Sequence, residues 1–380
     1  MLPKDRVLAA FEHHPADQVP IYQGGFSSHA ASHVLGREAY VGGGIQQYRE
    51  ACALWEGPEA HAEFLERSRR DAFDLIEVLD LDLVRVGYWR LNARPSARLD
   101  EHTFRYGDPE GAWQVMRFDP QTELYQVVGR SPTAPPTVAD LEALVVEEEA
   151  AAATYQPLPE HFGDCFAALE HFGDHRAVPG SGMGLAVPRE PVWLEACALR
   201  PELVGRLLDA QCLRAVRSID AQAPLGLRLM MGGGDFAGHG GPFFSPRTFH
   251  ELMLPRLQQI SEACRRQGMF HMFASDGNLW PVADELFGAS GVEGFYEVDR
   301  RAGMDLQRLR ERFPHLTLLG GISSETLHLG TVEEVVAETR DALAAAHELG
   351  SIIVGCSNQV ISQTPPGNTE AMMAVLYAER

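Results

Sequence analysis

The chain of 380 residues is short of basic side chains. It has 32 Lys and Arg against 53 Asp and Glu, which gives a formal net charge of −21. Unspecific nucleic-acid binding and attachment to anionic membranes both depend on dense Lys and Arg, so this balance argues against both kinds of partner. The sequence also lacks an apolar run of the roughly 20 residues that a membrane span needs. We therefore expect a protein that binds neither nucleic acid nor a membrane.

Cysteine is sparse and has no pattern. Six cysteines are scattered without CxxC spacing, and no apolar, cleavable leader precedes them, because the chain opens directly on an expected helix at residues 4–11. Unpatterned cysteines without a leader are typical of reduced thiols in the cytoplasm, which is the expected location. The six are Cys52, Cys165, Cys197, Cys212, Cys264 and Cys356.

Nucleotide-binding motifs are missing as well. The glycine runs at residues 42–44 and 232–234 match neither GxGxxG nor GxxxxGK[ST], which must lie between a strand and a helix to hold phosphates. Nucleotide binding is therefore not expected.

The sequence is rich in apolar runs that end in glycine or a polar residue and are followed by a helical pattern. Strands that alternate with helices indicate a parallel sheet buried on both faces. Eight such units predict one closed (β/α)8 TIM barrel that spans residues 1–380 as a single domain, and 45% hydrophobic residues suffice for its core. The strands are expected at residues 18–23, 83–86, 176–179 and 227–231, and from near Met269, Val292, Leu316 and Ser351.

A long segment separates the second and third expected strands. Residues 92–130 contain three β-rich runs divided by turn sequences at 107–111 and 119–120. This spacing predicts a small antiparallel β insertion. Residues 132–136, which contain three prolines, are expected to form a linker.

Two helices have well-marked ends. Ser245 followed by Pro246 predicts the start of a helix that Gly268 ends. Thr331 begins a capping box for a helix that ends before Gly350. Both helices belong to strand–helix units in the second half of the chain.

Acidic residues follow two of the expected strands. Asp235 and Asp276 stand beside glycines that let a substrate approach the backbone, where a carboxylate can act as acid, base or hydrogen-bond acceptor. The plainer alternative is that each caps the next helix, and the Gly-Asn-Leu-Trp after Asp276 suits that role. The glycine run 232–234 has no obvious structural need, which favours function for Asp235.

Four further residues invite a functional interpretation. Cys356 closes the last strand, where a thiolate could bind zinc or attack an electrophile, although buried structural cysteines are common. His239 lies in a glycine-rich loop just past Asp235, where it could hold substrate or simply form a turn. Glu297 could complete a metal site or pair with an arginine. His271 lies inside its strand and is expected to be a hydrogen-bonded core residue.

Several segments together carry a family resemblance. They are residues 6–12 with 17–20, 234–246, 275–278, 303–306, 320–322 and 364–368. In these segments the chain resembles the uroporphyrinogen decarboxylase superfamily from end to end, most densely from residue 226 onward. The resemblance implies a (β/α)8 barrel with its cleft at the carboxyl end of the strands. It also implies one of two activities, porphyrinogen decarboxylation or corrinoid-linked methyl transfer.

Three motifs bear on the choice between these activities. The decarboxylases carry an N-terminal Arg-Gln-Ala-Gly-Arg run whose arginines hold substrate carboxylates, but residues 22–29 contain no arginine. The zinc methyltransferases place a cysteine after the last strand, as Cys356 stands here, but their His-x-Cys-Gly motif reads Ala-Ser-Asp-Gly at 274–277. Residues 35–44 are similar to members that move a methyl group from an ether or amine to the cobalt of a separate corrinoid protein.

The resemblance therefore implies a methyltransferase that moves a methyl group between a small methoxy or methylamine compound and a corrinoid protein, with zinc as a candidate metal. A homodimer is possible, although the sequence does not disclose the oligomeric state. The alternatives are a decarboxylase of a porphyrinogen or a smaller pyrrolic or aromatic acid, and a noncatalytic tetrapyrrole- or corrinoid-binding protein. The expected site consists of catalytic Asp235, Asp276 and His239, substrate-binding Tyr22, His29, Asn278 and Asn358, and metal-binding Cys356 and Glu297.

Overall fold

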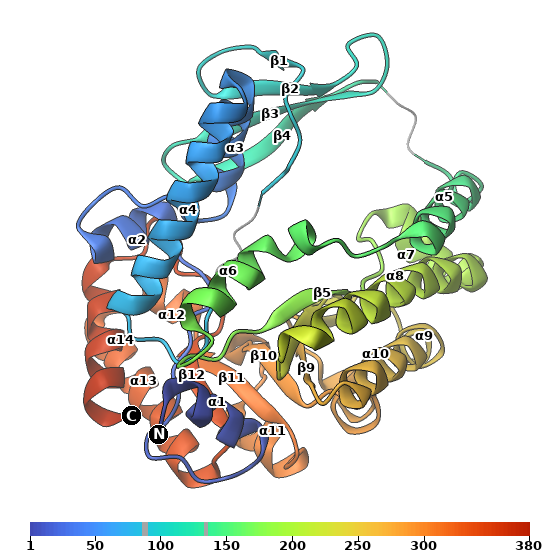
Figure 1. Ribbon diagram of the computed structural model, residues 1–380. Coiled ribbons are helices and arrows are strands. Elements are labelled where there is room, and N and C mark those ends of the chain that lie inside the picture. The colour runs from blue at the N-terminus through green and yellow to red at the C-terminus, as the bar shows by residue number, and fades with distance from the viewer. Residues whose placement is uncertain (86–89, 133–135) are drawn as a thin grey trace.

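A parallel sheet of six strands forms the centre of the computed structural model, which describes residues 1–85, 90–132 and 136–380 (Figure 1). The strand order is β12-β11-β10-β9-β6-β5. Five of the eight expected strands appear here, each beginning one or two residues later than expected. The six are β5 (Gly180–Gly184), β6 (Leu229–Gly233), β9 (Phe270–Ala274), β10 (Gly294–Val298), β11 (Thr317–Ile322) and β12 (Ile352–Cys356).

Single parallel bridges extend this sheet at both edges. Ile21 pairs with Val354 of β12, and Leu83 pairs with Ala177 just before β5. The amide of Asp82 donates a hydrogen bond to the carbonyl of Ile21 at 3.0 Å, which joins the two added segments to each other.

The three expected strands at residues 18–23, 83–86 and 176–179 are thus reduced to bridges, and residue 86 lies outside the described part of the chain. Pro20 and Pro179 explain two of these differences, because proline has no N–H to donate to a ladder.

A glycine makes the approach at the β12 edge possible. A Cβ at Gly355 would lie 1.6 Å from the carbonyl oxygen of Tyr22. No residue with a side chain could stand at this position without moving the Tyr22 segment away from β12.

Two apolar cores lie on opposite faces of the strands, as alternating side chains require. The larger core fills the space between the sheet and the helices. The smaller core joins side chains of the strands and the bridged segments to the first helix, α1 (Pro3–Phe11), which packs against the amino ends of β10 and β11. This smaller core comprises Val7, Ala10, Phe11, Tyr22, Leu83, Ala177, Leu229, Met272, Ala274, Tyr296, Leu319 and Ile353.

Helices cover the outer side of the sheet (Figure 1). The α-helices after α1 are α2 (Ser28–Leu35), α3 (Gly44–Glu56), α4 (Pro58–Val78), α5 (Leu141–Thr154), α6 (Gly163–Phe172), α7 (Pro191–Leu199), α8 (Pro201–Gln222), α9 (Pro246–Thr248), α10 (Leu254–Arg266), α11 (Leu306–Arg312), α12 (Ser324–Leu329), α13 (Val332–Leu349) and α14 (Pro366–Glu379). Short 3-10 turns occur at η1 (Pro159–Phe162), η2 (Ala223–Leu225), η4 (Trp280–Val282) and η6 (Arg300–Ala302), and π turns at η3 (Phe249–Met253) and η5 (Asp284–Ala289).

Both helices with marked ends form as expected. Thr331 caps α13 through a capping box with Glu334, and Gly350 ends it. Ser245 caps α9, which continues through η3 into α10. The π turn of η3 stands just ahead of Pro255, whose missing N–H interrupts the regular helical ladder.

The expected β insertion is confirmed. The strands β1 (Ala97–Arg98), β2 (Thr103–Gly107), β3 (Trp113–Asp119) and β4 (Leu124–Arg130) form an antiparallel sheet in that order. It lies over α3 and away from the main sheet (Figure 1), and Tyr48 of α3 stacks on Phe118 with ring centroids 4.3 Å apart. The expected linker at 132–136 falls largely outside the described residues.

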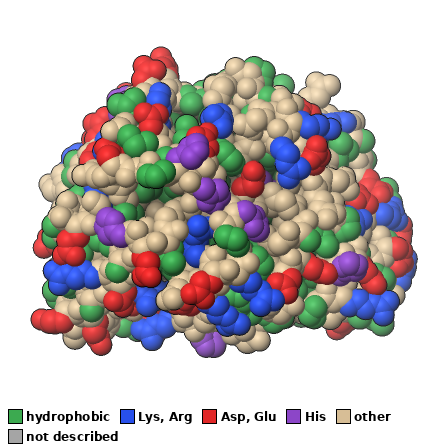
Figure 2. Space-filling view, turned by 90° about the horizontal axis from the view of Figure 1, so that it is seen from below, with side chains coloured by type: hydrophobic (Ala, Val, Ile, Leu, Met, Phe, Trp, Pro, Cys, Tyr) green, Lys and Arg blue, Asp and Glu red, His purple; other side chains and the backbone are tan. Residues whose placement is uncertain are grey.

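The surface carries charges of both signs. Figure 2 shows acidic and basic side chains intermingled on the face toward the viewer, although the chain as a whole is strongly acidic. Within the described residues, no helix has the length and apolar character needed to cross a membrane. All six cysteines are free, in agreement with the expected reduced thiols.

Candidate functional site

The carboxyl ends of the strands surround a cavity of about 370 Å³. Residues from all six strands of the main sheet or the turns after them line it, together with the Tyr22 segment and Arg85. Of the nine site residues predicted from the sequence, six line this cavity: Tyr22, Asp235, Asp276, Glu297, Cys356 and Asn358.

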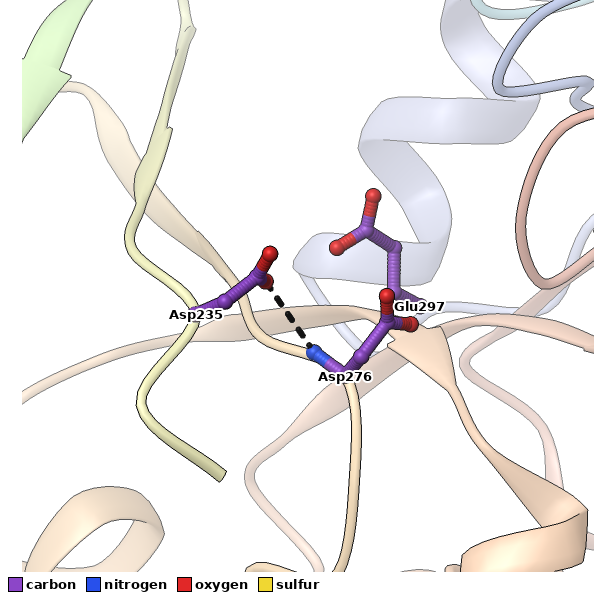
Figure 3. Close-up of side chains that lie close together, drawn as sticks. All are labelled: Asp235, Asp276 and Glu297. Carbon is purple, nitrogen blue, oxygen red and sulfur yellow. Dashed lines mark hydrogen bonds between the residues drawn. The ribbon is translucent and has the colours of Figure 1, made fainter. Parts of the chain in front are cut away.

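Three carboxylates converge in the cavity. Asp235 follows β6, Asp276 follows β9, and Glu297 lies in β10. Each offers an oxygen atom, and these atoms all lie within 4.8 Å of one another (Figure 3). Like charges at this spacing repel, so the cluster favours a bound proton or another positive charge.

Hydrogen bonds fix the two aspartates. The amide of Asn358 donates to both carboxylate oxygens of Asp276, at 3.1 and 3.0 Å. The backbone N–H of Asp276 donates to Oδ1 of Asp235 at 3.3 Å (Figure 3), and Arg189 binds the other Asp235 oxygen at 3.1 Å. The Asp276 carboxylate therefore contacts Asn358 across the cavity and does not cap the next turn, where Asn278 accepts the N–H of Trp280 instead.

A β-bulge presents Glu297 to the cluster. Tyr296 stands opposite Leu319 and Val298 opposite Gly320, so Glu297 is the extra residue of β10. Its φ of 72° lies in the left-handed region that residues other than glycine rarely adopt. Such strain costs on the order of 1–3 kcal/mol and clusters at functional sites. The bulge directs Glu297 into the cavity beside the two aspartates.

Burial changes the acidity of the cluster. Desolvation, with the negative charge of Asp276 adding to it, raises the pKa of Glu297 to about 8. Desolvation also raises the pKa of Asp276, helped by the charge of Asp235 and opposed by the hydrogen bond from Asn358. Glu297 therefore holds a proton near neutral pH, as a carboxylic acid that can donate it.

The glycine run before Asp235 has a structural need, contrary to the expectation from sequence. A Cβ at Gly232 would lie 2.5 Å from the Met183 carbonyl oxygen, and one at Gly233 would lie 2.4 Å from that of Ala274. A Cβ at Gly234 would lie 2.4 Å from the carbonyl oxygen of Leu185, the residue directly after β5. The run lets β6 pack tightly between its neighbours, so it is not evidence for a role of Asp235.

Arg85 is a cavity residue that the sequence analysis missed. It follows the bridge at Leu83 and lies beside Tyr22 and Tyr296. Burial alone would lower the pKa of Arg85, but the neighbouring Tyr22, Tyr296 and Glu297 outweigh burial and raise it. The available signal was an arginine directly after the apolar pair Leu-Val at a strand end.

Cys356 is not placed as a metal ligand. Its side chain belongs to the core between sheet and helices, and burial raises the pKa of its thiol to about 12. Among the described residues, the group that could hold a metal ion contains Asp235, Asp276 and Glu297 without this sulfur. Three carboxylates are oxygen donors suited to hard cations, so the donor set does not fit the Cys- and His-rich zinc site that the resemblance implied.

The remaining predicted site residues lie elsewhere. His239 is exposed in the turn between β7 (Ala237–Gly238) and β8 (Gly241–Pro242), and His29 is exposed on α2. Neither lines the cavity, and Asn278 is occupied with its own turn. His271 is buried, its Nδ1 lies 2.7 Å from the Ser261 hydroxyl, and burial lowers its pKa to about 3. The core assignment of His271 is thus confirmed.

Comparisons with known proteins agree with this architecture. The family model described as uroporphyrinogen decarboxylase (URO-D) matches residues 190–378, which include all three carboxylates. A solved methyltransferase from Methanosarcina mazei shares the fold with a TM-score of 0.67 at 19% identity, over 100% of this chain and 99% of that one.

Weaker comparisons add little. The IOLI protein with a binding zinc atom gives a TM-score of only 0.30 at 10% identity, over 63% of this chain and 94% of that one, and carries no weight. A search of curated proteins finds no match. The second half of the chain, residues 190–378, thus matches the uroporphyrinogen decarboxylase family, and the chain as a whole has the fold of the methyltransferase structure.

Proposed function

We propose that this protein is a methyltransferase that moves a methyl group between a small methylated substrate and a corrinoid carried by a separate protein. The observation that carries the proposal is the part-buried cluster of Asp235, Asp276 and Glu297 in the cavity, in which the pKa of Glu297 is raised to about 8. The methyltransferase fold of the Methanosarcina mazei protein adds support.

The chemistry requires a proton at one defined atom. When a methoxy group loses its methyl, the carbon–oxygen bond breaks and the electron pair stays on oxygen. The reaction is slow unless this oxygen receives a proton. Glu297 supplies this proton, while Asp276, held by Asn358, orients the leaving group. The corrinoid, when bound, supplies the nucleophile that accepts the methyl group.

Several glycines line the cavity. Gly24, Gly182, Gly184 and the run at 232–234 all line the cavity. Neighbouring strands fill the space beside the run at 232–234, but a Cβ at Gly184 would meet nothing within 4 Å, so a ligand can approach the backbone there. The open space beside Gly184 supports an approach of the corrinoid from this side of the cavity.

We also infer that the sheet closes into a (β/α)8 barrel that forms one domain over residues 1–380. The bridges of Ile21 to Val354 and of Leu83 to Ala177, with the hydrogen bond between Asp82 and Ile21, support closure. A cytoplasmic location is in keeping with six free cysteines, and a homodimer stays a prediction.

Decarboxylation is the second candidate, because Arg85 could hold the carboxylate of a pyrrolic or aromatic acid in the same cavity. Release of carbon dioxide without any corrinoid would identify it. A noncatalytic tetrapyrrole-binding role would show as a shift in visible absorption without turnover.

The proposed function is tested by methyl transfer to reduced cobalamin. Purified protein is incubated with cob(I)alamin and a series of methoxy and methylamine compounds, and methylcobalamin is followed by absorbance. We expect a rate that Glu297→Gln lowers by about 100-fold or more, the usual contribution of a positioned acid. Glu293→Gln is the matched control, because Glu293 is also part-buried with a raised pKa but bonds the His271 amide outside the cavity. No methylcobalamin with any compound would reject the proposal.

A further inference from the structure

A second cavity adjoins the first. It has a volume of about 310 Å³ and shares three lining residues with the carboxylate cavity: Arg85, Met231 and Tyr296. Its walls include the apolar side chains of Phe162 and Val178. His161 and Asp164 also line it, so Arg85 stands at the junction of an acidic chamber and one of mixed character.

Arg85 has no acidic partner. Among the described residues, no carboxylate oxygen lies within 4.0 Å of its guanidinium nitrogens, which is the limit for an ion pair. The stretches 86–89 and 133–135 contain no Asp or Glu. Glu297 is near enough to influence it but does not form an ion pair. Burying a guanidinium without a counter-ion is costly, so its persistence at a junction of cavities points to an anionic ligand.

A second polar group nearby also lacks a partner. The side chain of Tyr22 is only 2% exposed, and its hydroxyl lies next to the Arg85 guanidinium without a well-aligned hydrogen bond to any described residue. A Cβ built on Gly24 would lie 3.6 Å from this hydroxyl and 3.7 Å from Nη1 of Arg85, so the two groups flank the same position. Together they offer a charged fork of N–H donors and one O–H donor.

We propose that Arg85 and Tyr22 bind a carboxylate group of the substrate, so that the substrate class is a methylated carboxylic acid whose methylated end lies in the carboxylate cavity. This inference rests on the proposed methyl-transfer site, because it assigns the substrate of that site. The planar guanidinium matches a carboxylate through two parallel hydrogen bonds, which a neutral group of the same shape cannot reproduce.

The acidic cluster makes the arrangement selective. The negative charges of Asp235 and Asp276 repel a second anion, so the substrate carboxylate is favoured at Arg85 over a place within the cluster. The methylated atom can then reach Glu297 while the carboxylate stays at the junction.

Binding measurements on the protein alone test this inference, so that a failure of methyl transfer does not affect it. Isothermal titration calorimetry compares para-methoxybenzoate with para-methoxybenzamide, and methoxyacetate with methoxyacetamide. The members of each pair are alike in size and shape and differ in charge. We expect at least one carboxylate to bind wild type about 10- to 100-fold more tightly than its amide, the range for a charge-assisted hydrogen-bond pair.

Variants locate the binding group. Arg85→Met should remove the preference for the carboxylate, Arg85→Lys should keep part of it, and Tyr22→Phe should weaken carboxylate binding by less than Arg85→Met does. The control is Arg228→Met, which replaces a surface arginine that pairs with Glu12. This variant should leave the preference for the carboxylate unchanged. Circular dichroism checks that each variant folds. If Arg85→Met does not fold, the comparison of carboxylate and amide binding to wild type still tests the inference.

Two results would overturn the inference. One is equal binding of carboxylate and amide in both pairs, or no saturable carboxylate binding up to the solubility limit. The other is an unchanged preference for the carboxylate in folded Arg85→Met. Neither depends on a corrinoid, so methyl transfer with a substrate that lacks a carboxylate would uphold the proposed function and reject only this inference.

Discussion

Replacing Glu297 with glutamine tests the buried acid by a route independent of catalysis. Glutamine keeps the shape of the side chain and its place in the bulge but cannot ionise. In the wild type, the pKa of Glu297 rises from 4.5 to about 8 on folding, chiefly because burial disfavours the charged form. The folded protein therefore binds a proton that the unfolded chain releases above pH 4.5, and its stability falls as the pH rises from there through 8.

The size of the effect follows from the pKa difference. The change from 4.5 to about 8 corresponds to about 5 kcal/mol at about 1.36 kcal/mol per pKa unit. Below pH 4.5 the carboxyl group is protonated in both states, so Glu297→Gln should leave the free energy of unfolding nearly unchanged. Above pH 8 the variant should be the more stable protein by as much as about 5 kcal/mol.

Urea denaturation between pH 4.5 and 9 measures this difference. The free energy of unfolding of Glu297→Gln is compared with that of wild type, with Glu311→Gln on the exposed face of α11 as control. The two proteins should diverge with rising pH, while the control should follow wild type. Parallel curves over the whole range would show that Glu297 is an ordinary ionised surface acid and would refute the assignment of the proton.

Two further substitutions test residues whose roles the structure changes. Cys356→Ala should keep methyl transfer within a few-fold of wild type, because the thiol is protonated and faces the core between sheet and helices; full loss of activity in a folded variant would contradict this. In the folded wild type this thiol should also resist a thiol reagent. Gly233→Ala should destabilise the protein by more than about 2 kcal/mol or prevent folding, since its Cβ would lie 2.4 Å from the Ala274 carbonyl oxygen at a φ of 146°. Thermal unfolding measures this, and a melting temperature equal to wild type would show that the strands can separate at low cost.

The sequence determined the local pattern of the fold. The apolar runs located β6 and β9 to β12 within two residues, and the turn residues located the β insertion. Thr331 and Gly350 marked both ends of α13. These features depend on neighbours within a few positions, which is why they can be read from the chain itself. For the same reason, Asp235 and Asp276 could be assigned to strand ends.

Tertiary structure decided which groups meet and in what ionisation state. The bulge that turns Glu297 into the cavity depends on the register of β10 against β11, and Arg85 reaches the site from a segment that forms only a bridge. Packing of β12 against the helices likewise places the Cys356 thiol in the core between sheet and helices, outside the carboxylate group. Register and burial arise from segments far apart in the chain, and desolvation is a property of everything packed around a group. No local pattern in the sequence encodes either one.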